Sequence, residues 1–313
     1  MKRWIKIAIW TILLAVGVVI CAVRWQAWFG MPDEPEWTGD TISYVFPTFE
    51  RDTTLHSFDI LVLGDIHNGL NRSQYDTLAA RVPQADVVAQ VGDWVDRGYF
   101  YYHQLLLREW TNSDLYGMPV IACPGNHEYS KGLRKTLSPF WRDAFTYPHN
   151  SPIGVPGVSY YIDLPGVRMI ALDTNPLNRL MYLTRTLTWI RQAMKDAGKR
   201  YVVVIMHHPV HSARKGRHNA LIHAAFFHVL NDADLVISGH DHSYMRRMPY
   251  VVLNTSGRPK KQKDHIANDS TLISSPESVY GVISVPYSDK PLEWHVYRLD
   301  DGMPIDSVYV NHH

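Results

Sequence analysis

Five short polar motifs, each following an apolar run, constrain what this chain can fold into more than any other feature. The apolar runs are short and rich in β-branched and aliphatic residues, as buried strands are. Helical patterning lies between motifs, so the chain repeats the order strand, polar motif, helix. Because ligands of α/β sheets bind beyond the carboxyl ends of the strands, this repetition predicts one composite site. In chain order the motifs are Gly64-Asp65-Ile66-His67, Gly92-Asp93-Trp94-Val95-Asp96-Arg97-Gly98, Gly125-Asn126-His127-Glu128, His207-His208-Pro209 and Gly239-His240-Asp241-His242.

Hydrophobic periodicity predicts the elements around these motifs. Strands are expected at residues 58–63, 87–91, 119–122, 201–206 and 235–237, with a strand pair at 158–164 and 168–172. Helices are expected at 73–81, with Ser73 as N-cap, and at 99–110, 133–140, 184–197 and 219–230. Alternating runs predict further strands near 250–253, 271–274, 280–285, 292–298 and 305–310.

Histidine is the compositional outlier, with 17 among 313 residues, and the histidines gather in short clusters beside Asp, Asn and Gly. Neutral imidazole is the commonest metal ligand, and hard divalent ions take carboxylate oxygens. Two ions roughly 3.5 to 4 Å apart need a bridging ligand, and such a pair can clamp the attacking and leaving oxygens of a displacement. The two cysteines, Cys21 and Cys123, offer no cysteine-based zinc site and leave the redox compartment open.

The series D-x-H, GDxxDRG, GNHE, HHP and GHxH resembles the calcineurin-like metallophosphoesterase superfamily over about residues 58–242. The resemblance implies an α/β fold, a four-layer α/β/β/α sandwich whose second sheet the C-terminal strands complete. It also implies hydrolysis of a phosphoric ester at two divalent metal ions, for which Mn, Zn and Fe are all compatible. Monoesters, diesters and pyrophosphates stay open as substrates.

The resemblance assigns a role to each motif residue. One ion would be held by Asp65, His67 and His242, and the other by Asn126, His207 and His240. Asp93 would bridge the two ions. A metal-bound hydroxide would attack phosphorus, and His127 would protonate the leaving oxygen or bind phosphate.

The GDWVDRG and GNHE segments are most similar to the protein serine/threonine phosphatase branch. That likeness implies that Asp96 hydrogen-bonds His127 and fixes its tautomer, and that Arg97 clamps the substrate phosphate. Pro124 stands where that branch carries an arginine, which puts recognition of phosphoproteins in doubt. Asp96 stands where purple acid phosphatases carry a metal-binding tyrosine, which argues against their coloured iron site.

The N-terminus carries an uncharged apolar run at residues 7–23, flanked by tryptophans and long enough with its neighbours to cross a bilayer. Basic residues precede the run and acidic residues follow it, so the positive-inside rule places the N-terminus in the cytoplasm. The main domain would then be extracytoplasmic, periplasmic in a bacterium. A cleaved signal peptide is the alternative. The expected organisation is an anchor at 1–29, a linker with a first edge strand at 30–55, and a metallophosphoesterase domain at 56–313.

The expected function is therefore a membrane-tethered, dinuclear-metal phosphoesterase. The anchor makes an envelope or lipid-linked substrate attractive, and a sugar-nucleotide lipid pyrophosphatase is an alternative within the family. A membrane-anchored metal-binding or signalling module without turnover is the alternative from another class. A formal net charge of +1 and no basic stripe weigh against a nuclease and against a nucleic-acid partner. Oligomeric state stays open.

Several residues near the motifs keep two interpretations. His208 is expected beside the metals rather than among their ligands, and Asp241 is expected to point away from them. The basic cluster Arg214, Lys215 and Arg217 is either a solvated loop or a lid that attracts an anion. We expect His223 and His228 either to pack in the fold or to face solvent. Residues 99–102 either line a substrate pocket or pack in the core. Gly64, Gly92, Gly125 and Gly239 are expected to permit tight turns.

Overall fold

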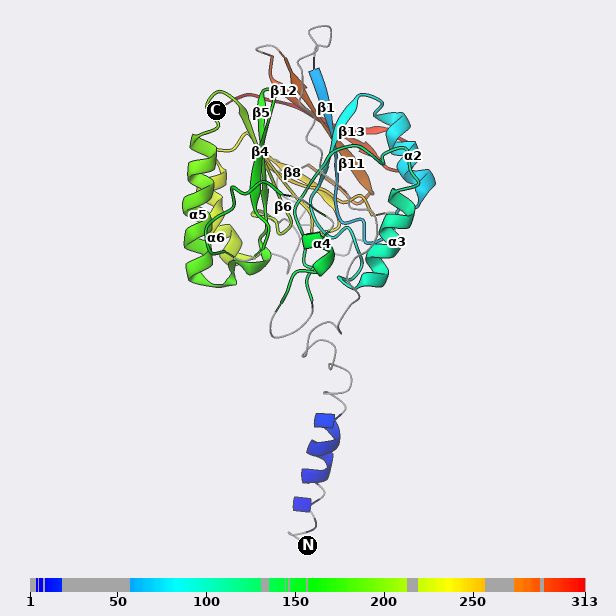
Figure 1. The fold of residues 1–313 in the computed structure, drawn as a ribbon, viewed down its shortest axis with the longest axis vertical. Helices are drawn as coiled ribbons and strands as arrows, with labels where there is room; N and C mark the ends of the chain where they lie inside the picture. Colours follow the sequence, from blue (N-terminus) through cyan, green and yellow to red (C-terminus); the bar gives the residue numbers. More distant parts are fainter. Residues whose placement is uncertain are drawn as a thin grey trace.

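Two β-sheets packed face to face form the centre of the protein. The computed structural model describes residues 4, 6, 7, 9–18, 57–130, 135–143, 145, 147–155, 157–212, 219–256, 273–287 and 290–312. The six-stranded sheet has the order β13-β12-β11-β1-β2-β3, and the seven-stranded sheet has the order β10-β8-β9-β7-β6-β5-β4. Helices cover the outer face of each sheet (Figure 1).

The six-stranded sheet combines the first and the last strands of the described chain. Its strands are β1 (Ser57–Leu63), β2 (Ala85–Gln90), β3 (Val120–Ala122), β11 (Val279–Pro286), β12 (Leu292–Arg298) and β13 (Pro304–Val310). β1, β2 and β3 run parallel, and β11 pairs antiparallel with β1. The expectation that the C-terminal strands complete the second sheet is therefore wrong for β11 to β13. They extend the first sheet, because β1 offers them its free edge.

The seven-stranded sheet holds the remaining strands. They are β4 (Tyr160–Leu164), β5 (Val167–Leu172), β6 (Tyr201–Met206), β7 (Leu235–Ser238), β8 (Tyr244–Arg247), β9 (Tyr250–Val252) and β10 (Ile273–Ser275). β5, β6, β7 and β9 run parallel in this order, while β4, β8 and β10 pair antiparallel with their neighbours. β8 was not predicted, since it begins only two residues after a polar motif.

The helices that follow β1 are α2 (Arg72–Arg81), α3 (Phe100–Trp110), α4 (Pro139–Asp143), α5 (Leu180–Lys195) and α6 (Ala220–Leu230), with a 3-10 turn η1 (Asn175–Asn178) before α5. Two of these helices, α2 and α6, begin at an asparagine side-chain cap, and the cap of α2 differs from the expected one. The N-cap of α2 is Asn71, not Ser73, because Asn71 and Gln74 form a reciprocal capping box. The helix expected at 133–140 is wrong over 135–138. There the backbone bonds to the preceding segment, as in Ser138 N to the Glu128 carbonyl at 2.9 Å.

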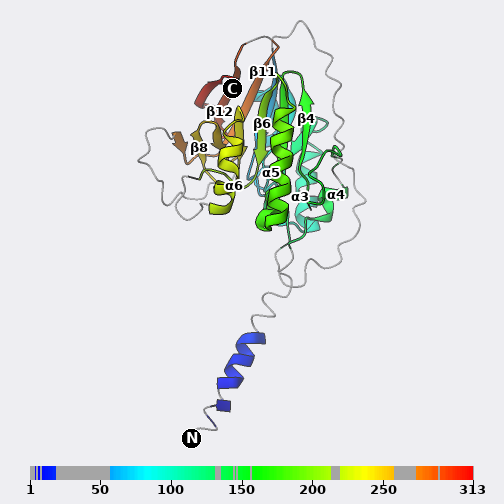
Figure 2. The ribbon, with the colours of Figure 1, turned by 90° about the vertical axis from the view of Figure 1, so that its left-hand side faces the viewer.

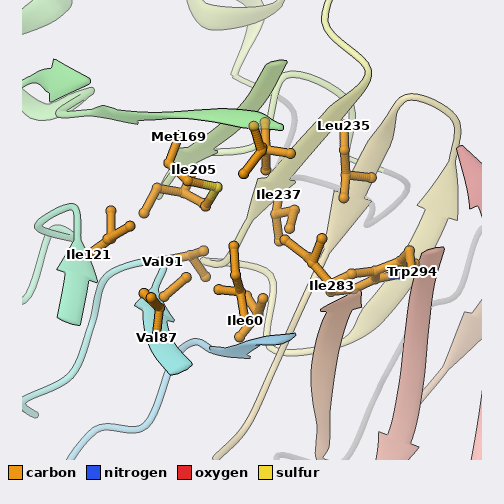
Figure 3. Packing of buried hydrophobic residues seen from close by; sticks show 14 of the residues in the cluster. Ile60, Val87, Val91, Ile121, Met169, Ile205, Leu235, Ile237, Ile283 and Trp294 are labelled. Atoms are coloured by element: carbon orange, nitrogen blue, oxygen red, sulfur yellow. The ribbon is translucent and has the colours of Figure 1, made fainter. Parts of the chain in front are cut away.

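Strands that are buried on both faces explain the unbroken apolar runs in the sequence. In β1, Ile60 and Val62 face the other sheet, while Leu61 and Leu63 pack under the helices. The core between the sheets includes Ile60, Ile205, Ile237 and Trp294 (Figure 3). A second core lies under α2 and α3, and a third lies under α5 and α6. Figure 2 shows α5 and α6 side by side on the outer face of the seven-stranded sheet. The predicted mixed α/β sandwich is confirmed.

The predicted membrane anchor is only partly described. Residues 9–18 are helical, and residues 19–55, which include the rest of the apolar run and the linker, lie outside the described residues. Within the described part of the chain, no helix has the length and apolar character needed to cross a membrane. The anchor stays a prediction.

An ion pair ties the two sheets together at one edge. Arg246 of β8 donates from Nε at 2.5 Å and from Nη2 at 3.0 Å to the two carboxylate oxygens of Asp306 in β13. The Tyr244 hydroxyl donates to the same carboxylate at 2.7 Å. Burial works to raise the pKa of Asp306, but these donors hold it below its usual range. The contact fixes how β8 lies over β13.

Replacing Asp306 with alanine is expected to destabilise the fold strongly, because it leaves a half-buried guanidinium without its carboxylate. We expect Asp306→Ala to lower the free energy of unfolding by about 3 kcal/mol in urea denaturation. Asp300→Ala is the matched control, since Asp300 lies 3.5 Å from Arg298 with its side chain 78% exposed. That control should change stability by about 0.5 kcal/mol or less. Equal losses in both variants would contradict a structural role for the edge pair.

Candidate active site

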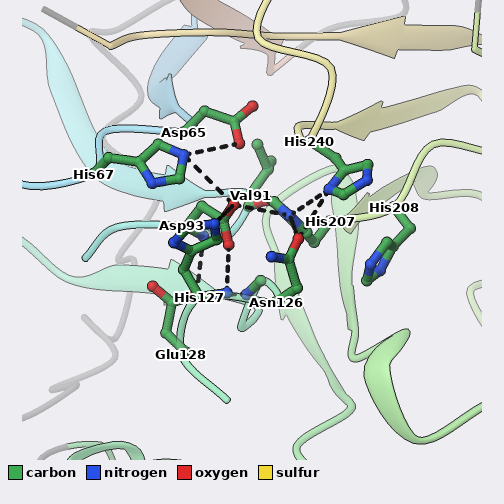
Figure 4. Close-up of polar contacts among 12 residues, drawn as sticks. Asp65, His67, Val91, Asp93, Asn126, His127, Glu128, His207, His208 and His240 are labelled. Carbon is green, nitrogen blue, oxygen red and sulfur yellow. Dashed lines mark hydrogen bonds and ion pairs between the residues drawn. The ribbon is translucent and has the colours of Figure 1, made fainter. Parts of the chain in front are cut away.

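The five motifs meet at the carboxyl ends of strands from both sheets (Figure 4). Asp65 follows β1, Asp93 follows β2 and Asn126 follows β3, all in the six-stranded sheet. His207 and His240 follow β6 and β7 of the other sheet. Backbone hydrogen bonds hold the loops side by side, including Asp65 N to the Gly92 carbonyl at 3.1 Å and Gly239 N to the His207 carbonyl at 3.1 Å. The strand order thus produces the predicted composite site.

The first cluster consists of Asp65, His67 and His242. One ligand atom from each lies within 4.8 Å of the others, and all three residues are buried. The His67 and His242 rings stack with centroids 4.8 Å apart. This is the set that the resemblance assigns to one ion.

The second cluster consists of Asp93, His207 and His240, again with ligand atoms within 4.8 Å of one another. The Asn126 side-chain oxygen lies 3.1 Å from His207 Nε2 and 2.9 Å from His240 Nδ1. His207 Nδ1 lies 3.1 Å from the Val91 carbonyl oxygen, which accepts its proton. Nε2 of His207 is therefore the nitrogen left for a metal.

Asp93 lies between the two clusters. Its Oδ2 is 3.5 Å from His67 Nε2 on one side and 3.3 Å from His207 Nε2 on the other. Burial works to raise the pKa of Asp93, but the surrounding imidazoles, His207 foremost, hold it well below its usual range. The structure brings all seven predicted metal-binding residues together, with the Asp93 carboxylate between the two clusters. Metal binding by them stays a prediction.

The donor set fits divalent cations. Neither carboxylate oxygen of the fully buried Asp65 has a hydrogen bond of good geometry. Burial raises the pKa of Asp65 well above its ordinary value. A buried carboxylate with so little hydrogen bonding is costly, and a bound cation would offset that cost. Mixed carboxylate, amide and imidazole donors suit Mn, Zn or Fe.

His127 lies beside the first cluster but outside both predicted ligand sets. Its ring meets the His67 ring edge-on with centroids 4.5 Å apart, and its Nε2 is 3.9 Å from Asp93 Oδ2. The predicted bond to Asp96 exists, but through the backbone: His127 Nδ1 lies 2.5 Å from the Asp96 carbonyl oxygen. A carbonyl only accepts, so Nδ1 carries the proton. The Asp96 carboxylate instead lies 3.8 Å from His67 Nδ1, and Arg97 is exposed.

Candidate ligands themselves adopt the left-handed backbone. Among the described residues, the non-glycine residues with positive φ are Asp65, His67, Asn68, Asp93, His240 and His242, with φ between 50° and 74°. Such conformations cluster at functional sites. The left-handed φ that favours glycine occurs at Gly92, with φ of 92°, and not at Gly64, Gly125 or Gly239. Those three allow close approach: a Cβ on Gly125 would lie 2.2 Å from Asp93 Oδ1.

Glu128 connects two of the loops, a role that was not predicted. Its buried carboxylate accepts hydrogen bonds from the backbone N–H groups of Asp93, Trp94, Val95 and Gly125, at distances of 2.6 to 3.1 Å. Burial raises the pKa of Glu128, and the backbone donors oppose that shift. The presence of a glutamate in the GNHE motif was the only signal for this role in the sequence. The role could not be predicted from it, because three of the four donors lie 33 to 35 positions earlier in the chain.

A segment after β5 supports the site from the other sheet, and it too was not predicted. The buried Asp173 carboxylate accepts from the hydroxyl of Tyr129 and from the backbone of Asn175 at 3.0 Å. The Asn175 amide donates to the carbonyls of Pro124 at 3.2 Å and Gly125 at 3.3 Å. This chain of bonds holds the loop that carries Asn126.

The structure shows where some of the residues near the motifs lie for which the sequence left the role open. The Asp241 carboxylate accepts from the Ser212 hydroxyl at 2.5 Å, outside the clusters. His223 packs against Phe227 with its Nδ1 2.9 Å from the Val210 carbonyl. Tyr102 packs on the core, while Tyr101 is 62% exposed. The basic cluster at 214–217 lies outside the described residues.

The sequence matches a known family over the segment that carries these motifs. Residues 58–244 match the family model described as calcineurin-like phosphoesterase. This chain belongs to that family.

Relatives of this calcineurin-like phosphoesterase include purple acid phosphatase 3 of Arabidopsis thaliana, 26% identical over 216 residues. The match covers 58% of this chain and 57% of the relative, so the chain spans little more than half of that protein. A purple acid phosphatase from yellow lupin (Lupinus luteus) seeds has a TM-score of 0.63 at 12% identity, over 82% of this chain and 54% of the other. GAP50, the anchor in the inner membrane complex of Plasmodium, has a TM-score of 0.58 at 14% identity, over 82% and 89%. These two structures share the fold.

Replacing Glu128 with glutamine is expected to loosen two site loops at once, because an amide offers one acceptor and sets N–H donors against backbone N–H groups. We expect Glu128→Gln to lower the free energy of unfolding by about 3 kcal/mol, measured by urea denaturation. Elemental analysis should also find fewer metal ions per chain. Glu109→Gln is the control, because the Glu109 carboxylate accepts one backbone N–H, that of Arg72, at 3.0 Å. Its free energy of unfolding should fall by less than about 1 kcal/mol. Full stability of Glu128→Gln would rule out the connecting role.

Proposed function

We propose that this chain is a phosphoesterase that hydrolyses phosphoric esters with two divalent metal ions, Mn, Zn or Fe. The observation that carries the proposal is the pair of clusters that share Asp93. One carboxylate lies 3.5 Å from a nitrogen of the first cluster and 3.3 Å from a nitrogen of the second. Membership of the calcineurin-like phosphoesterase family supports the reaction class.

The chain's residues would divide the work between metal binding and proton handling. Asp65, His67 and His242 would hold one ion, and Asn126, His207 and His240 the other, with Asp93 shared. Bound divalent ions would supply Lewis-acid chemistry, lowering the pKa of a water molecule and neutralising phosphoryl charge. The protein's share is to fix these donors in place before substrate arrives.

His127 is the residue placed to move a proton. Its Nδ1 proton is held by the Asp96 carbonyl, which leaves Nε2 on the side of Asp93 and the clusters. When protonated at Nε2, this imidazole would donate to the leaving oxygen. Arg97 is exposed next to this loop, where its guanidinium could reach a phosphate.

Membrane tethering is part of the proposal and rests on the sequence. The apolar run at residues 7–23 and its charge asymmetry support a single-pass anchor with the catalytic domain outside the cytoplasm. Such a tether would favour envelope or lipid-linked phosphate esters by raising their effective concentration.

Metal-dependent turnover by the full-length chain in detergent tests the proposal. With Mn²⁺ present, we expect hydrolysis of p-nitrophenyl phosphate or of bis-p-nitrophenyl phosphate, abolished by a chelator. Asp93→Asn should lower kcat/KM by about 100-fold or more, because it removes the shared carboxylate. Bound metal without turnover on any ester would favour a binding module, and absence of both would reject the metal site.

The role of His127 is tested through the leaving group. His127→Ala should lower kcat/KM by about 100- to 10,000-fold for an alkyl phosphate ester, whose leaving oxygen needs a proton. The loss should be much smaller for p-nitrophenyl esters, because p-nitrophenolate leaves without protonation. The exposed His149 provides the control, His149→Ala, which should change neither value. Equal losses for both leaving groups would argue against proton donation.

A further inference from the structure

Asn68 directly follows a predicted metal ligand, and its side chain joins two points of another segment of the site. Its Oδ1 accepts the backbone N–H of Asp96 at 2.8 Å, and its Nδ2 donates to the Tyr102 carbonyl at 2.8 Å. A backbone N–H only donates and a carbonyl only accepts, so these partners fix which way the amide is turned. One amide therefore holds both ends of the segment from Asp96 to Tyr102, which includes Arg97.

The backbone of Asn68 is itself held in place, so its amide starts from a defined position. The N–H of Asn68 donates to the Trp94 carbonyl at 3.0 Å, and the N–H of His67 donates to the Asp93 carbonyl at 2.9 Å. Asn68 has a φ of 53°, a left-handed conformation that asparagine adopts more readily than most residues with a side chain. These contacts place the Asn68 side chain against the loop that follows β2.

Two side chains accept four consecutive backbone N–H groups of that loop, those of residues 93–96. Glu128 accepts the first three, and Asn68 accepts the fourth, that of Asp96. The carbonyl oxygen of Asp96 lies 2.5 Å from Nδ1 of His127. Because the N–H and the carbonyl belong to the same residue, a shift of the Asp96 N–H would also move the oxygen that holds the His127 ring.

We propose that Asn68 is a positioning residue, which holds the His127 ring in its place beside the first cluster through the backbone of Asp96. The inference rests on the proposed function and deepens it, because it names the residue through which the catalytic imidazole is oriented. Misplacing a catalytic group by about 1 Å can cost about 100-fold in rate. Loss of the Asn68 amide should therefore slow the reactions that need His127 and spare those that do not.

Rates with two leaving groups test this in the full-length chain. The pair is glycerol 2-phosphate and p-nitrophenyl phosphate for a monoesterase, or glycerophosphocholine and bis-p-nitrophenyl phosphate for a diesterase. Asn68→Gly removes both hydrogen bonds of the amide and leaves the backbone free to keep its left-handed conformation. We expect kcat/KM to fall about 10- to 100-fold for the alkyl ester and much less for the p-nitrophenyl ester.

Asn150→Ala is the matched control. The Asn150 amide also bridges backbone groups, since it donates to the Tyr161 carbonyl at 2.9 Å and accepts the Tyr161 N–H at 3.1 Å. Tyr161 lies in β4, the outermost strand of the seven-stranded sheet, and not at the clusters. The control thus loses the same two kinds of hydrogen bond, and its ratio of alkyl-ester to p-nitrophenyl-ester kcat/KM should equal that of the wild type.

Asn68→Asp is a milder second variant. Its carboxylate keeps an acceptor for the Asp96 N–H and loses the donor to the Tyr102 carbonyl. We expect its ratio of the two rates to lie between those of the wild type and of Asn68→Gly. A ratio as low as that of Asn68→Gly would place the effect at Tyr102 and overturn the path through Asp96.

A double-mutant cycle tests whether Asn68 acts through His127. In the His127→Ala background, Asn68→Gly should lower the alkyl-ester rate by less than about twofold, because the ring that it positions is gone. Equal losses for both leaving groups, or full additivity of the two substitutions, would overturn the inference and leave the proposed function standing. A wild-type protein without metal-dependent turnover on any ester would reject the proposed function itself.

Discussion

A single buried carboxylate decides the shape of the site. Glu128 accepts four backbone N–H groups from two different loops, and no neutral side chain could satisfy so many donors at one point. Because those donors include Asp93 and Gly125, the bonds fix the shared carboxylate relative to the loop of Asn126. Ionised acceptors make stronger hydrogen bonds, which offsets the cost of taking the charge out of water. The relative positions of Asp93 and of the loop that carries Asn126 follow from this contact.

The sequence predicts the strands well, because β1 and β6 are buried on both faces and so read as unbroken apolar runs. The prediction for β6 matches residue for residue. The candidate ligands could be predicted for a related reason, since each follows a strand at the sheet edge where ligands bind. Which sheet β11 to β13 would join could not be predicted, because alternation shows that a strand is half-buried but not which edge it pairs with.

The supporting residues escaped prediction because their effect passes through the backbone. Asn175 acts on Pro124 and Gly125 across about 50 positions, and nothing in its own neighbourhood signals this. Asp96 has a similar double use: its carbonyl holds His127, while its carboxylate faces His67. A tyrosine, as the resemblance places there in purple acid phosphatases, would keep the carbonyl and lose the carboxylate. At this position beside the first cluster, the chain departs from that pattern.

The left-handed backbone at the candidate ligands has a thermodynamic consequence. Five of them, Asp65, His67, Asp93, His240 and His242, hold a side chain where glycine would be relaxed. At about 1 kcal/mol each, the strain amounts to about 5 kcal/mol, comparable with the net stability of a whole domain. The hydrophobic cores and the loop contacts must therefore contribute enough stabilising free energy to offset this backbone strain at the edge that carries the motifs. A protein that no longer needed this chemistry could carry glycine at these positions and would gain free energy of unfolding.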